Sequence, residues 1–445
     1  MRGGLFHPDF PYSPKKLPFF YGWLIAFGSM MGTLFSIPGQ TMGFSVFTEI
    51  LMGEFQLSRV ALSSAYFVGT VASGLTLPFA GRLFDYWGAR RMIVLSAVAT
   101  GLVLLFLSES ADVARGISAI LPESWRTGIA FVVIGLGFYL IRLSAQGILT
   151  MTSRNVVGKW FDIRRGLAMS LSGVFISFGF SVAPKVLDLL INRFEYDGAW
   201  RFLAILTLFV MAPLGWFIFR DNPEECGMEM DGPNVTRPTK ENPDMVIYRE
   251  YTKSEAVRTF SFHAFNLSFA FFAMYSTAYT FHIESLGAEF GFEKSRIINL
   301  FIPMAAISVT TNLFFGWINS KTRLKYMLLI MNLGALLGTI GLYKLGTDWG
   351  VPAYVIGTGI TGGVFSSLAG VVWPRFYGRK WLGSISGIAM SSMVIASGVG
   401  PWLFAVFFEF TGSYELILII CIALPATLCV GSLFADNPQR KVLET

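Results

Sequence analysis

A single arginine stands in the middle of a long apolar stretch of this sequence. Arg142 lies within residues 127–153 and is followed by Gln146. A cation at the centre of a membrane helix costs about 2.5–3.5 kcal/mol on insertion scales, so such a residue usually has a function. A guanidinium offers two parallel donors that match a carboxylate, and Gln146 shares the helix face one turn on. Both residues are therefore candidates for binding or coupling an anion. The alternative is a structural arginine that bonds backbone carbonyls or reaches the membrane surface.

A second set of chemically informative residues follows an apolar run that ends near residue 80. It consists of Gly81, Asp85, Gly88, Arg90 and Arg91. Gly81 lets two helices approach closely, and Gly88 permits a tight turn. Asp85 is suited to a helix N-terminus, where a negative charge is stabilised, or to a neighbouring arginine. We predict that these residues make contacts between helices across the cytoplasmic face.

Other polar residues inside apolar runs are weaker candidates. The segment from Ile37 to Thr41 contains Pro-Gly and predicts a helix break, which at membrane depth is tolerated where it lines a cavity. This makes Gln40 a candidate site residue. His282 is able to carry a proton near neutral pH, although a histidine at an interface is also explained by solvation. The remaining candidates for substrate contact are Tyr66, Asn266, Tyr275, Tyr279 and Asn299.

The composition tells us which elements must position these residues. The 445-residue chain is 53% hydrophobic and only 14% charged, whereas soluble proteins carry about 25% charged residues. Apolar runs long enough to cross a bilayer recur throughout, and such runs must be helices. We therefore predict an all-α polytopic membrane protein with twelve transmembrane helices. The expected spans are 20–45, 59–80, 91–108, 127–153, 166–191, 199–219, 259–282, 296–317, 324–344, 350–373, 382–408 and 415–434.

The distribution of charge predicts the orientation and excludes several functions. Most of the 34 lysines and arginines fall in the segments on one side of these spans, which places both termini in the cytoplasm of a cell (inner) membrane protein. Basic residues at span ends are a topology signal, so we expect no nucleic-acid partner. Three scattered histidines and three cysteines indicate no metal site. Without a GxxxxGK[ST] motif we expect no ATP site, no cofactor and no enzymatic activity.

The two halves of the chain repeat each other. Phe219-Arg-Asp-Asn-Pro223 returns as Phe434-Ala-Asp-Asn-Pro438, 215 residues later. We predict an N-terminal half (1–219), a cytoplasmic linker (220–258) and a C-terminal half (259–445). Parallel six-helix repeats are one way in which secondary transporters are built. The second-half loop that begins at Gly316 keeps its basic residues but lacks an aspartate, so the contacts at the cytoplasmic face are expected to be asymmetric.

The loop from Gly81 to Arg91 resembles the signature of the major facilitator superfamily, and Arg142 with Gln146-Gly147 resembles its fourth-helix motif for proton or anion coupling. A narrower resemblance, to the monocarboxylate transporter and oxalate–formate antiporter branch, covers most of the chain. The motifs that carry it are 21–23 (YGW), 159–168 (KWFDIRRGLA), 221–227 (DNPEECG), 255–259 (EAVRT), 400–401 (GP) and 411–414 (TGSY). The interior of the eighth span has no basic residue where that branch commonly holds a substrate-binding arginine, and this places more weight on Arg142.

The resemblance implies a membrane transporter of small organic anions that works by alternating access, with proton symport or exchange, as a monomeric functional unit. It also implies a conformational latch made of Gly81, Asp85, Gly88, Arg90 and Arg91, because in the family the Asp85 contact latches the two halves in the outward-facing state. Two other functions stay open from the sequence. One is efflux of amphipathic compounds or drugs, which the aromatic content of 16% favours. The other is a non-transporting sensor or scaffold, because fold does not determine function.

Overall fold

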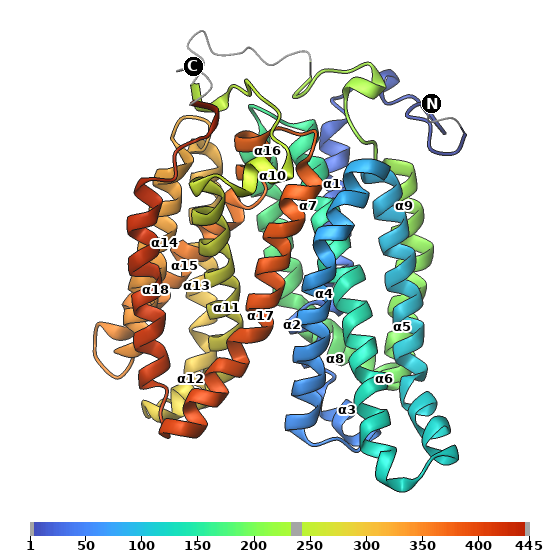
Figure 1. The fold of residues 1–445 in the computed structure, drawn as a ribbon, viewed down its shortest axis with the longest axis vertical. Coiled ribbons are helices and arrows are strands. Elements are labelled where there is room, and N and C mark those ends of the chain that lie inside the picture. Colours follow the sequence, from blue (N-terminus) through green and yellow to red (C-terminus); the bar gives the residue numbers. More distant parts are fainter. Residues whose placement is uncertain (1–3, 233–242, 441–445) are drawn as a thin grey trace.

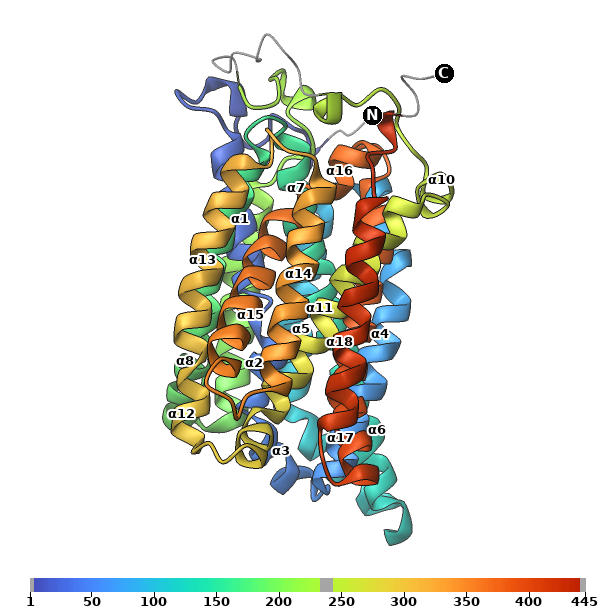
Figure 2. The ribbon, with the colours of Figure 1, turned by 90° about the vertical axis from the view of Figure 1, so that its left-hand side faces the viewer.

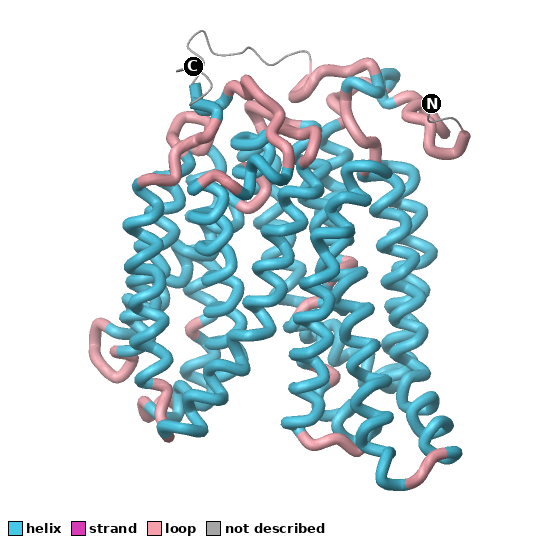
Figure 3. Tube along the Cα trace, viewed as in Figure 1, coloured by secondary structure: helices cyan, strands magenta, loops and turns pink. Residues whose placement is uncertain are grey.

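The computed structural model of the chain describes residues 4–232 and 243–440. Those residues form helices and loops without a strand, as Figure 3 shows. The helices of the first half are α1 (Gly22–Leu34), α2 (Thr41–Ser45), α3 (Thr48–Phe55), α4 (Arg59–Trp87), α5 (Ala89–Ile120), α6 (Arg126–Ile141), α7 (Thr150–Trp160), α8 (Arg165–Leu206) and α9 (Ala212–Ile218). Those of the linker and second half are α10 (Lys253–Val257), α11 (Phe260–Glu289), α12 (Lys294–Asn299), α13 (Phe301–Ile318), α14 (Leu324–Tyr343), α15 (Gly350–Leu368), α16 (Val372–Tyr377), α17 (Leu382–Thr411) and α18 (Glu415–Leu433).

The predicted twelve-helix fold is confirmed. Nine helices of the described ranges are long and apolar enough to cross a membrane. The longest of them, Arg165–Ile218, contains two spans, because the chain reverses at Glu195, whose φ of 63° breaks the helix. The short apolar helix α1 and the Phe-rich helix α11 supply the other two spans. The polar segment around residues 192–198 explains why the chain turns at this point.

The helices form two six-helix bundles that lie side by side (Figure 1). Both termini and the linker lie at one end of the molecule, and a view turned by 90° shows the same placement (Figure 2). We call this the terminus-bearing end. The ribbons of the two halves meet there and diverge toward the opposite end (Figure 1).

Two pairs of helices hold the halves together at the terminus-bearing end. Gly81 of α4 lies against Gly383 of α17, and a Cβ on Gly81 would come within 2.2 Å of the Gly383 carbonyl oxygen. Gly316 of α13 lies against Gly166 of α8 in the same way, with a Cβ on Gly166 only 2.5 Å from the Gly316 carbonyl oxygen. Small residues therefore allow backbone-to-backbone packing across the interface.

The internal repeat of the sequence returns as a repeated contact. Asp221 accepts a hydrogen bond from the backbone N–H of Arg90 at the start of α5, at 3.0 Å. Asp436, which lies 215 residues later, pairs with Lys325 at the start of α14, at 2.8 Å. The end of each half thus folds back on its third transmembrane helix.

Gly81→Ala tests the close approach of α4 and α17. The added methyl meets backbone that cannot rotate away, so overpacking should destabilise the protein by about 1–3 kcal/mol and lower its thermal unfolding temperature. Gly116→Ala is the matched control, since nothing lies within 4 Å of a Cβ at that helical position. Equal unfolding temperatures for the two variants would contradict the packing.

Candidate functional site

The Arg142 side chain is buried where four segments of the chain meet. It is 1% exposed. Its Nη1 donates to the carbonyl oxygen of Gly39 at 3.1 Å and lies 3.4 Å from the Thr41 hydroxyl. Its Nη2 donates to the Ser397 hydroxyl of α17 at 3.0 Å, and the guanidinium lies over the Tyr66 ring, 5.1 Å from its centre. One guanidinium therefore contacts both halves of the molecule.

This guanidinium has no counter-ion among residues 4–232 and 243–440. The only ionisable side chain close enough to affect it electrostatically is Tyr66. Its Nε is buried and makes no hydrogen bond. A buried charge is costly unless it is paired and hydrogen-bonded. The site thus carries a positive charge that neutral oxygens satisfy only in part, and chemically it is suited to an anion.

The local sequence explains how Gly39 reaches Arg142. After α1 the chain makes a short 3₁₀ turn, Ile37–Gly39, which contains Pro38. Gly39 packs so closely on the fourth span that a Cβ there would lie 2.7 Å from the Ile141 carbonyl oxygen. The fourth span itself contains a π-helix, Arg142–Leu149, between α6 and α7. Such segments occur frequently at functional sites. The break at 37–41 follows the sequence-based expectation, whereas the π-helix was not predicted.

The two candidate glutamines take different positions. Gln40 donates to the Ser36 hydroxyl at 3.0 Å and lies 3.4 Å from the Thr150 hydroxyl, so it ties the broken first span to the start of α7. Gln146 has a buried Oε1 without a hydrogen-bond partner. Because a π-helix bonds i to i+5, the α-helical spacing that predicted a face shared by Arg142 and Gln146 does not apply unchanged.

The second-half candidates lie mainly in the interior of that half. Asn266 of α11 donates to the Ser392 hydroxyl of α17 at 3.0 Å. Tyr275 and Tyr279 stack obliquely, with ring centres 5.1 Å apart, beside a water-sized cavity of about 10 Å³. Asn299 ends α12 and is exposed at the end of the molecule opposite the termini (Figure 1). No hydrogen bond joins any of these four described residues to Arg142.

The hydrogen bonds of His282 also go to residues other than Arg142. Its Nε2 faces the Pro401 carbonyl oxygen at 3.0 Å and must donate, because a carbonyl only accepts. Its Nδ1 then accepts from the Tyr414 hydroxyl at 2.9 Å. The neutral imidazole is thus satisfied at both nitrogens and joins α11 to α17 and to the start of α18.

Asp85 lies across the interface between the halves. Its two carboxylate oxygens accept hydrogen bonds from the backbone N–H groups of Gly383 at 2.6 Å and Ser384 at 2.7 Å. These groups begin α17, and the N-terminus of a helix favours a negative charge. Gly88 ends α4 with a φ of 81°, which permits the tight turn into α5.

Arg90 and Arg91 were predicted to belong to the same latch, but their contacts lie within the first half. Arg90 donates to the carbonyl oxygens of His7 at 2.9 Å and Phe10 at 2.7 Å. Arg91 lies over the Phe6 ring, 5.4 Å from its centre. Both arginines therefore hold the N-terminal segment on the bundle, and among the described residues neither hydrogen-bonds to the second half.

Further contacts between the halves were not predicted. Asn155 of α7 donates to the Ser386 hydroxyl of α17 at 2.7 Å. Asn312 of α13 donates to the backbone carbonyl of Ser170 at 3.1 Å, and the Ser170 hydroxyl donates back to the carbonyl of Asn312 at 2.9 Å. These residues are polar positions among many small ones in the sequence, and nothing in the sequence singles them out.

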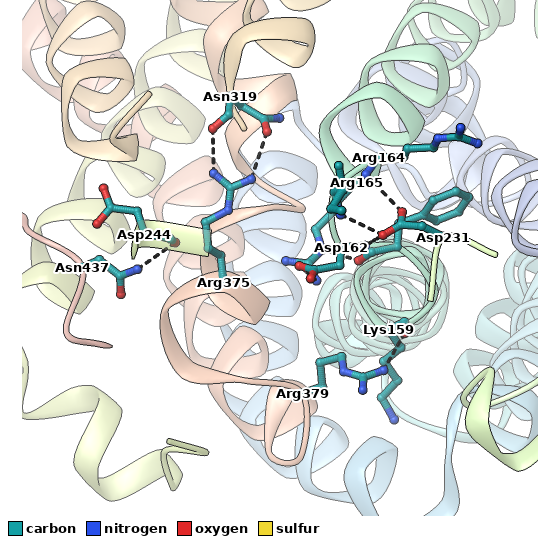
Figure 4. A network of polar contacts seen from close by, with 12 residues as sticks. Lys159, Asp162, Arg164, Arg165, Asp231, Asp244, Asn319, Arg375, Arg379 and Asn437 are labelled. Atoms are coloured by element: carbon teal, nitrogen blue, oxygen red, sulfur yellow. Dashed lines mark hydrogen bonds and ion pairs between the residues drawn. The ribbon is translucent and has the colours of Figure 1, made fainter. Parts of the chain in front are cut away.

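Arg379 forms another bridge at the terminus-bearing end. It donates to the carbonyl oxygen of Lys159 at 2.8 Å (Figure 4) and to the Glu224 carboxylate at 2.7 Å. Arg379 is the repeat partner of Arg164. The repeat identified this pair as architectural but not the contact that Arg379 makes.

The chain was compared with known families and structures. A family model described as Major Facilitator Superfamily matches residues 22–401. The structure resembles a bacterial homologue of the iron transporter ferroportin in its outward-facing state (TM-score 0.65, 13% identity, covering 92% of this chain and 99% of that one). It also resembles the human organic anion transporter MFSD10 (0.60, 14%, 94% and 100%) and the E. coli fucose:proton symporter FucP (0.60, 12%, 94% and 98%). No curated protein matched. At these identities the structures establish the fold alone.

Asp85→Asn tests the contact at the start of α17. The amide loses the negative charge that the helix N-terminus stabilises by about 0.3–2 kcal/mol, so we expect the terminus-bearing end to open more often. The rate at which maleimide labels a cysteine at position 386 should rise. Asp112→Asn, at an exposed surface pair with Arg115, is the control. An unchanged labelling rate in Asp85→Asn would show that the contact does not hold this end closed.

Proposed function

Because the chain belongs to the major facilitator superfamily of membrane transporters, we propose that it carries a small organic anion, a mono- or dicarboxylate, by alternating access. The observation that supports this substrate class is the buried guanidinium of Arg142, which lacks a carboxylate partner among the described residues. The resemblance to the monocarboxylate and oxalate–formate branch supports the same class. Movement is coupled to a proton or to exchange for a second anion.

The donors of Arg142 are bound to weak acceptors in this conformation. A backbone carbonyl and a hydroxyl take Nη1 and Nη2, and Nε has none. Hydrogen bonds between ionised partners are roughly twice as strong as neutral ones. A carboxylate that reaches the guanidinium therefore replaces neutral acceptors with a charged one and compensates a buried positive charge.

The same contact offers a route from binding to conformational change. Nη2 is held by Ser397 of the second half, whereas Nη1 is held by Gly39 of the first. A substrate that takes Nη2 from Ser397 removes one polar contact between the halves at the depth of the site. A ligand shifts a conformational equilibrium only by its differential affinity for the two states, and the loss of this contact supplies such a difference.

The charge of the site favours a monocarboxylate over a dicarboxylate. One guanidinium compensates one negative charge, and α13 contains no basic residue that would compensate a second. The surroundings also favour exchange over proton symport. Tyr66 is the only ionisable side chain of the described chain that acts on Arg142, and His282 bonds elsewhere with both nitrogens.

The membrane placement follows from the basic residues. Arg82, Arg91, Arg164 and Lys321, for example, lie in the loops and helix ends of the terminus-bearing end, so the positive-inside rule makes that end cytoplasmic in a cell (inner) membrane. We also propose a monomeric functional unit, because one chain contains both six-helix halves.

Uptake by proteoliposomes tests the substrate class. The purified protein is reconstituted and offered a panel of labelled mono- and dicarboxylates, with and without a pH gradient and with and without unlabelled substrate inside. We expect saturable monocarboxylate uptake that internal substrate accelerates. Efflux of hydrophobic cations without carboxylate flux would indicate an exporter of amphipathic compounds, and no flux of any solute would indicate a sensor or scaffold.

Arg142→Lys tests the binding role of the guanidinium. Lysine keeps the charge but loses the planar fork, so the apparent KM should rise about tenfold, the equivalent of one good hydrogen bond to a charged group. Arg142→Gln should abolish uptake. Arg126→Lys, at an exposed arginine, is the control. Transport by Arg142→Lys at the rate and affinity of the unmodified protein would contradict the role.

A further inference from the structure

Four buried N–H donors without acceptors lie where the start of α8 meets the end of α13. They are Nη1 and Nη2 of Arg165, Nε of Arg375 and Nδ2 of Asn319. Arg165 and Asn319 are 0% exposed and Arg375 is 1% exposed. Buried polar groups in folded proteins are nearly always hydrogen-bonded, so a group of unsatisfied donors without a single unsatisfied acceptor requires an explanation.

Figure 4 shows the residues that carry these donors. Asn319 accepts from Nη1 of Arg375 through its backbone oxygen at 2.8 Å and from Nη2 through its side-chain oxygen at 3.0 Å. Its Nδ2 points at the first turn of α8, since it lies 1.7 Å from where a Cβ on Gly166 would be. Arg165 begins that turn. The first half therefore supplies one guanidinium and the second half supplies the other with its amide.

The charges of this group are only partly balanced by the described neighbours. Burial, together with the positive charge of Arg165, lowers the pKa of Arg375 to about 9. Asp162 forms an ion pair with Arg165, its carboxylate oxygen 3.6 Å from Nη2, but this distance is too long for a hydrogen bond. Asp231 uses its oxygens on the backbone N–H groups of residues 162–164, at 2.8–3.1 Å. Among the described residues, one carboxylate at ion-pair distance thus serves two buried guanidiniums, and neither guanidinium hydrogen-bonds to it.

The internal repeat shows what is missing. The start of α8 is the repeat partner of the start of α17, where the Asp85 carboxylate accepts from two backbone N–H groups. Asp85 lies four residues after Gly81, and the residue four after Gly316 is Ser320. The second half therefore has no carboxylate at the position that would place one on α8.

We propose that a small monovalent anion, of the size of chloride or formate, binds between Arg165, Arg375 and Asn319 and replaces the missing carboxylate. Guanidinium and amide donors at the N-terminus of α8 are the chemistry that binds anions. Because the donors are sealed from solvent, the ligand must be small. The anion joins the two halves at the terminus-bearing end and stabilises the conformation in which that end is closed. This site is separate from Arg142 and does not depend on the transported substrate.

A comparison of chloride with gluconate tests the site, because chloride is small enough to enter it and gluconate is too large. The purified full-length protein, with its three cysteines replaced and spin labels on the terminus-bearing ends of the two halves, is titrated at constant ionic strength. Chloride should saturably raise both the closed fraction and the unfolding temperature. Arg165→Gln should weaken the apparent chloride affinity at least about tenfold, whereas Arg164→Gln, whose side chain points away from the group (Figure 4), should not.

Ser320→Asp provides the decisive variant, also where Arg165→Gln fails to fold. A carboxylate supplied by the chain should close this end in gluconate and abolish the response to chloride. Identical behaviour of the unmodified protein in chloride and gluconate would overturn the site, as would a full chloride response in Ser320→Asp. Arg142→Gln should keep the chloride response while losing transport. Loss of the response in that variant would place the anion at Arg142 and overturn the second site.

Discussion

A guanidinium buried between two helix bundles, without a carboxylate partner among the described residues, is the central physical constraint in this molecule. Arg142 lies deep in the fourth span, and its hydrogen bonds go to a broken first span and to α17 of the other half. The helix break at Pro38 and the π-helix that begins at Arg142 both serve this contact, because they bring the Gly39 carbonyl within reach. A buried cation without a charged partner is costly, and this cost is the basis of our proposal that an anion binds there.

The terminus-bearing end shows how a repeated architecture is used asymmetrically. The halves meet along two seams, one between α4 and α17 and one between α8 and α13. Backbone packs on backbone in both, through Gly81 and Gly383 in the first and Gly166 and Gly316 in the second. One seam is closed by the Asp85 carboxylate on the start of α17. In the other, no described carboxylate of the second half reaches the start of α8, and buried donors of Arg165, Arg375 and Asn319 lack acceptors. The first seam is therefore complete in the chain itself, whereas the second, on our proposal, is completed by an ion from solution.

The sequence was sufficient for the fold and for the central residue, and it was insufficient for the partners of that residue. Hydrophobic length, the charge bias and the 215-residue repeat predicted twelve helices in two halves, and a cation in an apolar run identified Arg142. Ser397 could not be predicted, because it is one of several serines in α17 and only packing shows which one meets the guanidinium. Arg90 was placed in the latch on motif spacing, but the N-terminal segment, which carries no recognisable motif, offers its carbonyls to Arg90 instead. The π-helix has no sequence signal as simple as proline or periodicity.

The most direct test of the central claim is a structure of the transporter with a monocarboxylate bound. The account predicts a carboxylate oxygen within about 2.7–3.0 Å of the Arg142 guanidinium, as charge-assisted hydrogen bonds require, with Ser397 no longer bonded to Nη2. A substrate bound elsewhere, with Arg142 still held by Gly39 and Ser397, would contradict it.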